Sequence, residues 1–547
     1  MASRLTTFII TLIVAGTVIA GLIVGAQRDD ASGRVDLIVT NGRVFTGNGG
    51  KLAEAVAIQG NKILRVGSNR VIKRLRRPET LMLDAHGAAV LPGLIDTHVH
   101  LAAASLGRAG LDLTEASSLQ HVQQRLGEYA QTHPESVWIR GRGWSYSLFE
   151  NGLPTREMLD EAAAERAAFL VASDGRTGWA SSRALELAGI TRHTPNPKGG
   201  VIVKDPATGE PTGALIDAAQ DLLVQALPEV TRAERLEGLR QAIDEAHSMG
   251  ITSVHSIADT PADIELYAAE RAADMLRLRV YSALAVTPAD REAQIGRLDT
   301  LRERYPDDPV LKTGAAVLTH DAEANDRAGS ADAPAVVTEL SRTIELLDAH
   351  GWQTIVEPRT DAELAGSLDG FERARNANEA PARGRRHRLE HISALDLPTA
   401  ERIAQLGLTL SLRPTMEGFD PAVPKLGSTS RVRLTFGSDW PFTPIDPRLV
   451  MAAVTDAPPA LHVPANDAAP VDPLPIDRVL QAFTADAAWA SFDEQRKGKL
   501  ARGMLADLVI LTSDIFAPGR RVRDVEVDTT IFDGKVVYSR TPGLGTH

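Results

Sequence analysis

Short apolar runs alternate with longer, mixed stretches through the middle of the chain. The runs are rich in β-branched residues, and the stretches between them repeat hydrophobic residues at helical spacing, as in residues 231–250. The runs occupy residues 88–100, 251–257, 278–286, 310–318, 352–358, 386–392, 408–414 and 433–441. Eight strands that alternate with helices predict an α/β fold, a (β/α)₈ TIM barrel.

The segment 102–230 interrupts this alternation and is too long for a loop. It contains an apolar run at 167–173 and a turn-rich stretch at 204–211 between two alternating segments. We therefore expect an insertion in the barrel that has a strand and a hairpin of its own.

Both ends of the chain show the two-residue alternation of half-buried strands. "VDLIVTNGRVFTG" and "AVAIQGNKILRVG" lie near the beginning, and "ADLVILTSD" and "VEVDTTIFDGKVVYSR" lie near the end. Asn-Gly and Asp-Gly pairs mark hairpin turns. The pattern predicts a small β-sandwich built from residues 31–90 and 495–547, with the barrel at 91–494 between them.

The N-terminal segment is the most apolar part of the chain. Leu5–Ala26 has no charged residue, and at about 1.5 Å per residue it would span a hydrocarbon core of about 30 Å. Residues 1–30 are thus expected to form a transmembrane anchor or a signal segment cleaved before Gln27. We favour a retained anchor, with the catalytic domain outside the cytoplasm, on the periplasmic side if the source is Gram-negative.

Composition narrows the chemistry. The formal net charge of −12 argues against a nucleic-acid partner, because phosphate binding needs a basic face. The chain has no cysteine, which excludes disulfides and thiolate metal sites. A metal ion would have to be held by His, Asp, Glu or a modified Lys.

Two histidines close the first apolar run, "LPGLIDTHVH". His98 and His100 are two residues apart, so on a strand they point to the same face and can bind one ion. Catalytic residues of a barrel lie where its strands end. The later runs carry four further candidates: Glu357, His391 and Asp439 at or near the ends of their runs, and Lys312 within the run 310–318.

Each candidate also has a structural interpretation. The first-run histidines could pack in the core, Asp439 could cap the next helix, and Lys312 could form a salt bridge. Glu357 could ligate a metal or pair with Arg359 or Lys312. His387 competes with His391, since both lie on one strand face.

The order of motifs resembles the amidohydrolase superfamily, specifically the amidohydrolase-3 branch that contains N-substituted formamide deformylases. The motifs are "LPGLIDTHVHL", "WIRGRGW", "LPTREMLDEAA", "SDGRTGWASSRALELAGI", "GITSVHS", "GWQTIVEPRTD", "RHRLEH", "GSDWP" and "GKLARGMLADLVIL". They follow one another in the family's order and cover nearly the whole chain.

The resemblance implies a centre of one or two divalent metal ions, with Zn²⁺ as the first candidate. His98 and His100 would bind one ion, a carboxylated Lys312 would bridge two, and His391 would bind the second. Asp439 would bind metal and act as the general base toward a metal-activated hydroxide.

The chain departs from the family pattern where the family has a histidine in the fifth strand. Glu357 stands there, and we expect it to replace that ligand. Lys312 lacks the Asp-Gly that usually follows it, and Arg176 replaces a histidine of the insertion.

Three residues are candidates for substrate binding. Arg176 is either a clamp for a substrate carboxylate or a surface charge. Trp144, together with Trp179, either walls an apolar pocket or packs in a core, and His255 either lines the pocket or is a satisfied strand histidine.

These expectations lead to one function and two alternatives. The first is a metal-dependent hydrolase that cleaves a C–N bond, amide-like or cyclic, in a small molecule. The changes at Glu357 and beyond Lys312 motivate the first alternative, a non-catalytic barrel that binds a ligand or metal. An ester or lactone hydrolase is the second alternative, because the same hydroxide attacks any activated carbonyl.

Overall fold

The computed structural model describes residues 35–541 except 50–51, 109, 135, 150–151, 164, 174, 287–290, 319–332, 416–418, 421 and 457–472. The anchor expected at Leu5–Ala26 lies outside these residues. Among the described residues, every helix is too short or too polar to cross a membrane.

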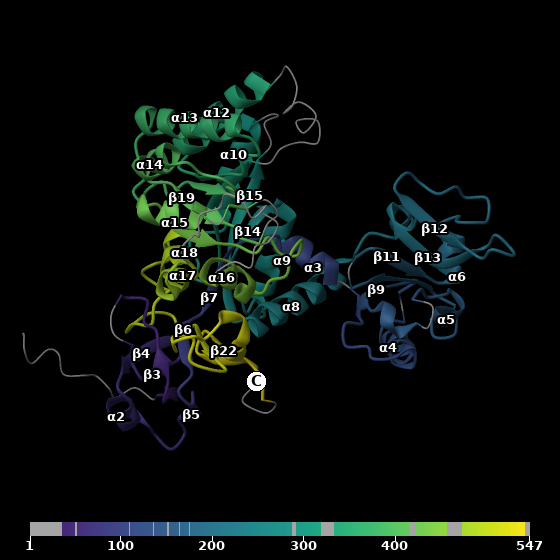
Figure 1. Cartoon of the computed structure of the whole chain (residues 1–547), viewed down its shortest axis with the longest axis horizontal. Coiled ribbons are helices and arrows are strands. Elements are labelled where there is room, and N and C mark those ends of the chain that lie inside the picture. The colour runs from purple at the N-terminus through teal and green to yellow at the C-terminus, as the bar shows by residue number, and fades with distance from the viewer. Residues whose placement is uncertain are drawn as a thin grey trace, which may run out of the picture.

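Eight parallel strands form the central sheet, in the order β20-β19-β18-β17-β16-β15-β14-β7 (Figure 1). They are β7 (Leu94–Val99), β14 (Ile251–Asp259), β15 (Arg279–Val286), β16 (Leu311–Leu318), β17 (Gln353–Val356), β18 (Arg388–Glu390), β19 (Thr409–Leu412) and β20 (Arg433–Phe436). Each expected run supplies one strand of this sheet, and the predicted barrel is confirmed.

Helices alternate with these strands. They are α8 (Arg232–Ser248), α9 (Pro261–Ala272), α10 (Arg291–Arg304), α12 (Ala333–Ala349), α13 (Asp361–Ala377), α14 (Leu397–Leu406), α15 (Ala422–Thr429), α16 (Pro447–Thr455), α17 (Ile476–Ala482) and α18 (Ala485–Ala490). Helix α8 begins with a capping box, in which Thr231 and Glu234 satisfy each other's backbone amides. Leu239 and Ile243 of α8 are buried against the barrel, together with His247 in its last turn.

The first and last strands close the barrel just where both end. The amide of Asp439 donates to the carbonyl oxygen of His98 (2.8 Å), and the amide of His100 donates to the carbonyl oxygen of Trp440 (2.7 Å). Glycine is required at position 437, because a Cβ there would lie 2.4 Å from the Cβ of His98. Barrel closure itself therefore brings residues 98, 100 and 439 together.

The apolar run at 88–100 forms two strands instead of one. β6 (Ala89–Pro92) belongs to a different sheet, and β7 starts after Gly93. A Cβ on Gly93 would lie 2.1 Å from Oγ1 of Thr252, so only glycine fits where the chain enters the barrel. Periodicity could not reveal this break, because both strands are buried throughout.

Residues from both chain ends form two further sheets beside the barrel (Figure 1). One contains β1 (Leu37–Thr40), β3 (Ala55–Gln59), β4 (Lys62–Gly67) and β5 (Leu81–Asp84). The other contains β2 (Arg43–Val44), β6, β21 (Leu508–Leu511), β22 (Val527–Phe532) and β23 (Lys535–Ser539). Buried residues of both sheets share one hydrophobic cluster, as in a sandwich.

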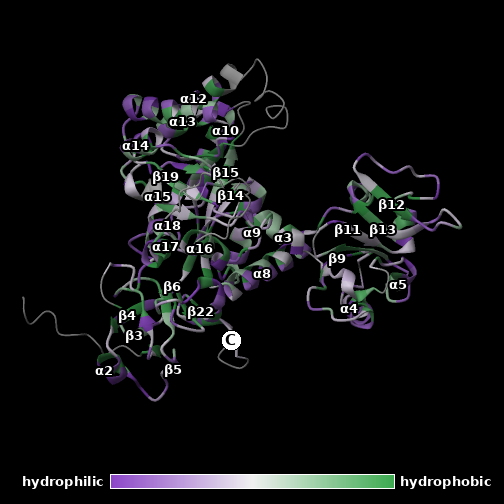
Figure 2. Cartoon of the chain, in the orientation of Figure 1, coloured by the Kyte–Doolittle hydropathy of each residue, from purple (hydrophilic) through white to green (hydrophobic). Residues whose placement is uncertain are grey.

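The insertion folds as a lobe to one side of the barrel (Figure 1). Helix α3 (Leu101–Arg108) leads into it, and its six-stranded sheet contains β8 (Leu111–Asp112), β9 (Trp138–Trp144), β10 (Ala167–Ala172), β11 (Thr177–Ala180), β12 (Gly200–Lys204) and β13 (Pro211–Asp217). Its helices are α4 (Leu119–Thr132), α5 (Glu157–Asp160), α6 (Ser182–Leu187) and α7 (Asp221–Val224). In Figure 2, hydrophobic residues gather on strands β12 and β13, and the loop beyond them is hydrophilic.

Candidate metal centre

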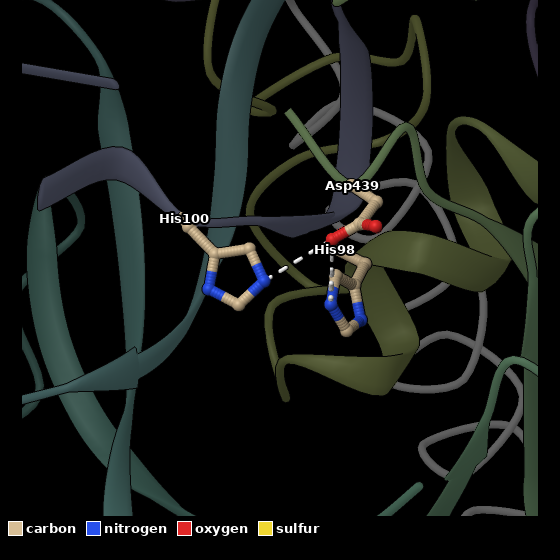
Figure 3. Close-up of side chains that lie close together, drawn as sticks. All are labelled: His98, His100 and Asp439. Carbon is tan, nitrogen blue, oxygen red and sulfur yellow. Dashed lines mark hydrogen bonds and ion pairs between the residues drawn. The ribbon is translucent and has the colours of Figure 1, made fainter. Parts of the chain in front are cut away.

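His98 and His100 extend from the end of β7 toward Asp439 (Figure 3). The Oδ1 atom of Asp439 lies 3.1 Å from Nε2 of His100 and 3.7 Å from Nε2 of His98. The His98 side chain is 1% exposed and that of His100 is 23% exposed. One residue is therefore deep in the barrel, and the other lies at its mouth.

Two further strand ends reach the same place. Oε1 of Glu357, which follows β17, lies 3.5 Å from Nε2 of His98. The ring of His391, which follows β18, lies 4.2 Å from the His98 ring, centroid to centroid. Donor atoms of His98, Glu357 and His391 lie within 4.8 Å of one another, as do those of His98, His100 and Asp439.

Backbone strain positions two of these side chains. His391 has a φ of 54° and Asp439 a φ of 65°, in the left-handed region that side chains other than glycine rarely adopt. Such strain costs about 1–3 kcal/mol per residue and gathers at functional sites. It turns both side chains from the strand ends toward His98.

Burial keeps the imidazoles neutral. Desolvation lowers the pKa of His98 well below its usual value, and it lowers the pKa of His391 to about 2, with the His98 charge as the next cause. Desolvation also raises the pKa of Glu357 to about 7, followed by repulsion from Glu390. Neutral imidazole is the form that binds a metal ion.

The donor atoms fit a divalent metal. Nε2 of His98 and Nε2 of His391 are buried and have no hydrogen-bond partner among the described residues. Nδ1 of His98 lies 3.2 Å from a carboxylate oxygen of Glu390, which only accepts, so Nδ1 carries the proton and Nε2 holds the free lone pair. Two buried imidazole nitrogens without hydrogen-bond partners among the described residues, beside carboxylates, are a suitable donor set for Zn²⁺.

Lys312 does not reach this centre, which corrects the expectation that it is a ligand. It is the second residue of β16, so it lies at the opposite, N-terminal mouth of the barrel. There its Nζ forms a buried ion pair with Asp493 (2.8 Å). Toward the C-terminal end of β16, Val317 packs in an apolar cluster with Ile257 and Ile355.

The residues expected to bind substrate lie elsewhere. Trp144 is fully buried in the lobe, where its Nε1 donates to the carbonyl oxygen of Leu170 (2.8 Å) and its ring contacts Trp179. Arg176 is exposed on the lobe and pairs with Asp217 (3.2 Å). Both expectations of a pocket role are thus corrected, because Trp144 packs in the core of the lobe and Arg176 is a surface charge.

His255 is fully buried inside the barrel, which corrects the expectation that it lines the pocket. Its Nδ1 lies 2.9 Å from Nη1 of Arg388, so it belongs to the polar interior of the barrel. Arg388 also pairs with Glu390 (2.5 Å), and both of these side chains are fully buried.

Sequence reasoning missed Glu390, Arg388 and Arg413. Glu390 and Arg388 lie in "RHRLEH", beside a candidate ligand, and Arg413 directly follows β19. Arg413 contacts Oδ2 of Asp439, the carboxylate oxygen that does not face His100. The rule that strand ends carry functional residues would have found Arg413.

The chain is similar to known proteins over most of its length. The family model described as "Amidohydrolase family" matches residues 82–538. The putative amidohydrolase YtcJ of Bacillus subtilis is 28% identical over 540 residues, which cover 90% of this chain and 97% of the relative. The N-substituted formamide deformylase of Arthrobacter pascens is 27% identical over 542 residues, which cover 92% of this chain and 99% of the relative.

A solved structure shares the fold. An uncharacterised metal-dependent hydrolase from Pyrococcus furiosus aligns with a TM-score of 0.58 at 20% identity, covering 86% of this chain and 97% of that one. At this identity the likeness supports the barrel and its accompanying sheets and no finer property.

Proposed function

The chain belongs to the amidohydrolase family, and from that premise we propose that it is a metal-dependent hydrolase that cleaves a C–N bond of a small molecule. The observation that carries the proposal is the environment of Nε2 of His98. It is buried, has no hydrogen-bond partner among the described residues, and faces carboxylate oxygens of Glu357 and Asp439 at 3.5 and 3.7 Å. A buried lone pair in such surroundings is costly unless a ligand or ion binds it.

We propose one ion per chain. The two possible ligand triplets, with His100 and Asp439 or with Glu357 and His391, share His98. Its Nδ1 is engaged by Glu390, which leaves one lone pair, on Nε2. Because one lone pair binds one ion, the triplets are alternative subsets of ligands around a single ion.

A divalent ion bound there, with Zn²⁺ as the first candidate, would supply a Lewis acid and lower the pKa of a water molecule. Asp439 would accept a proton at Oδ1 from the attacking water and deliver it to the leaving nitrogen. Glu390 would hold the proton on Nδ1 of His98, and Arg388 would fix Glu390.

The bond class rests on the relatives. One relative that covers nearly the full chain is named N-substituted formamide deformylase, which motivates an amide-like C–N bond here. Trp144 is buried within the lobe and Arg176 pairs with Asp217 on its surface, so neither side chain indicates a particular substrate group. The substrate should therefore be tested among small amides and cyclic amides, with esters and lactones as comparison.

Metal analysis of the purified chain tests the proposal. We expect about one divalent ion per chain, and loss of most of it in the double variant His98→Ala with His100→Ala, because each lost ligand removes much of the affinity. The metal-loaded chain should hydrolyse an N-substituted formamide, and the double variant should not. A chain that retains no ion would instead support the non-catalytic barrel.

We also propose that residues 1–30 anchor the protein to a membrane, from the uncharged run Leu5–Ala26. Full-length protein should then sediment with membranes and resist extraction by high salt. Deletion of residues 1–30 should release a folded protein that still binds metal. A mature chain that begins at Gln27 in the soluble exported fraction would rule out the anchor.

A further inference from the structure

We propose that Arg413 takes the place of a second metal ion, holding Asp439 and binding the acyl oxygen of the substrate. This inference rests on the proposed function, since it assigns a role within the same hydrolytic centre. Arg413 directly follows β19, between the strands that lead to His391 and Asp439. Its side chain is 18% exposed, so it lies at the wall of the site.

The two oxygens of Asp439 have different neighbours. Oδ1 faces Nε2 of His100 and Nε2 of His98, whereas Oδ2 contacts Nη1 of Arg413. In a two-metal centre each ion neutralises part of the surrounding negative charge. Here a guanidinium, which is always protonated, does so on the Oδ2 side of the carboxylate.

Charge balance favours this assignment. Glu390 and Arg388 neutralise each other in the barrel interior. Glu357 and Asp439 carry two negative charges as carboxylates, and Arg413 carries one positive charge. One divalent ion with a hydroxide then makes the centre neutral, whereas a second divalent ion would leave a buried positive charge unbalanced.

β16 is the strand from which a ligand bridging two ions was expected, and none of its described residues reaches the centre. β16 turns Ala315 and Val317 into the apolar cluster of the barrel interior, and Lys312 is paired at the opposite mouth. Among the described residues, β16 therefore offers no anionic side chain that could bridge a second ion to the first.

Arg413 also has donor capacity to spare. Its Nε is buried and has no hydrogen-bond partner among the described residues, although Nη1 is engaged by Asp439. A buried donor without a partner is costly, and a ligand that supplies an acceptor relieves that cost. The guanidinium can thus donate a hydrogen bond to a substrate oxygen atom beside the carboxylate.

A cation at this position would stabilise the negative charge that develops on the acyl oxygen. As the water oxygen bonds to the carbonyl carbon, its proton passes to Asp439 and the π electrons move to the acyl oxygen. Arg413 keeps its protons and donates hydrogen bonds to that oxygen. When the C–N bond breaks, the electrons return to re-form the carbonyl, and Asp439 returns the proton to the leaving nitrogen.

Zn²⁺ affinity and anion affinity measured on the same variants test the inference. Arg413→Met removes the charge and keeps much of the volume, and Arg413→Lys is the matched control that keeps the charge. Because a cation beside the site repels metal, Arg413→Met should bind Zn²⁺ about tenfold more tightly or better, in competition with a chelator. The Zn²⁺-loaded Arg413→Met chain should bind inorganic phosphate about tenfold more weakly than the wild type, and Arg413→Lys should remain within a few-fold in both assays.

These opposite changes separate the inference from its alternatives. General damage to the fold would weaken both Zn²⁺ and phosphate binding in Arg413→Met, and that outcome would overturn the inference. So would unchanged affinities, a wild type that binds two Zn²⁺ ions, or a Zn²⁺-loaded wild type that does not bind phosphate. A wild type that binds no metal would refute the proposed function itself, before the variants are compared.

Discussion

Nδ1 of His98 lies 3.2 Å from Oε2 of Glu390, and both side chains are buried, with exposed fractions of 1% and 0%. The contact fixes which ring nitrogen carries the proton and leaves Nε2 toward Glu357 and Asp439. It connects the candidate centre to Arg388, whose guanidinium lies in the barrel interior. The orientation of His98 thus depends on a charged pair that does not itself face the cavity.

Replacing Glu390 should weaken metal binding without removing a ligand. Glu390→Gln keeps the size of the side chain but loses the charge that holds His98. We expect a 10- to 100-fold loss of Zn²⁺ affinity. Arg388 is left buried without its partner, which should also lower the free energy of unfolding by about 3–5 kcal/mol. Chelator competition at a temperature where both proteins are folded measures the first effect, and wild-type affinity there would contradict this role.

Much of the barrel could be predicted because its strands are buried, short and β-branched, and because helices separate them. The candidates at residues 98, 357, 391 and 439 could be predicted because each lies at the end of such a strand. The prediction for Lys312 was wrong because this residue stands at the start of its strand and not at the end. It is the second residue of β16, six residues before the strand ends at Leu318. The direction of a parallel strand decides which mouth of the barrel its residues face.

The lobe could not be predicted at the level of side chains. Trp144 ends a strand, as a pocket residue would, but its indole packs between the sheet and helices of the lobe itself. Sequence shows that a tryptophan is at a strand end and does not show which face the local sheet buries. The pairing of Arg413 with Asp439 likewise joins the ends of two neighbouring strands, β19 and β20, and the sequence does not show that these two side chains turn toward each other.

Lys312 should be dispensable for metal binding. Lys312→Arg preserves the positive charge beside buried Asp493 but cannot form the carbamate that a bridging role requires. Metal content should equal that of the wild type, with a stability loss of about 1–3 kcal/mol because the larger head overpacks the site. If elemental analysis of Lys312→Arg found the ion lost, the placement of Lys312 away from the centre would be incorrect.

His247 should make the chain less stable in mild acid. Burial lowers its pKa in the folded state to about 4 from 6.5, and its Nε2 lies 2.7 Å from the carbonyl oxygen of Arg277. Between pH 6.5 and 4, His247 is protonated in the unfolded chain but neutral in the folded chain. The free energy of unfolding is therefore unaffected by this residue above pH 6.5 and decreases as the pH falls toward 4.

His247→Gln isolates this contribution. Glutamine can still donate to the carbonyl oxygen of Arg277 but does not titrate. In the metal-free protein, we expect the slope of unfolding free energy against pH to decrease by up to about 1.4 kcal/mol per pH unit over this window. Urea unfolding at several pH values measures the slope, and identical slopes in the two proteins would refute the assignment.

Glu357 stands where the family pattern has a histidine ligand. Substitutions at this position give the most specific test of the centre. Its Oε1 lies 3.5 Å from Nε2 of His98, and its side chain is 33% exposed, so it faces the cavity from the end of β17. Glu357→Gln should lose metal and activity, because the amide is a weak ligand for Zn²⁺ compared with a carboxylate. Glu357→His should retain the ion, since imidazole is a common Zn²⁺ ligand.

The pair of substitutions distinguishes ligation from simple charge balance. If Glu357 contributes only its charge, Glu357→His should lose metal as Glu357→Gln does, since both remove one negative charge. If it ligates, a metal-loaded crystal structure should place one of its oxygens about 2.0–2.2 Å from Zn²⁺. Full metal content and full activity in Glu357→Ala would show that the ion is held by His98, His100, His391 and Asp439 alone.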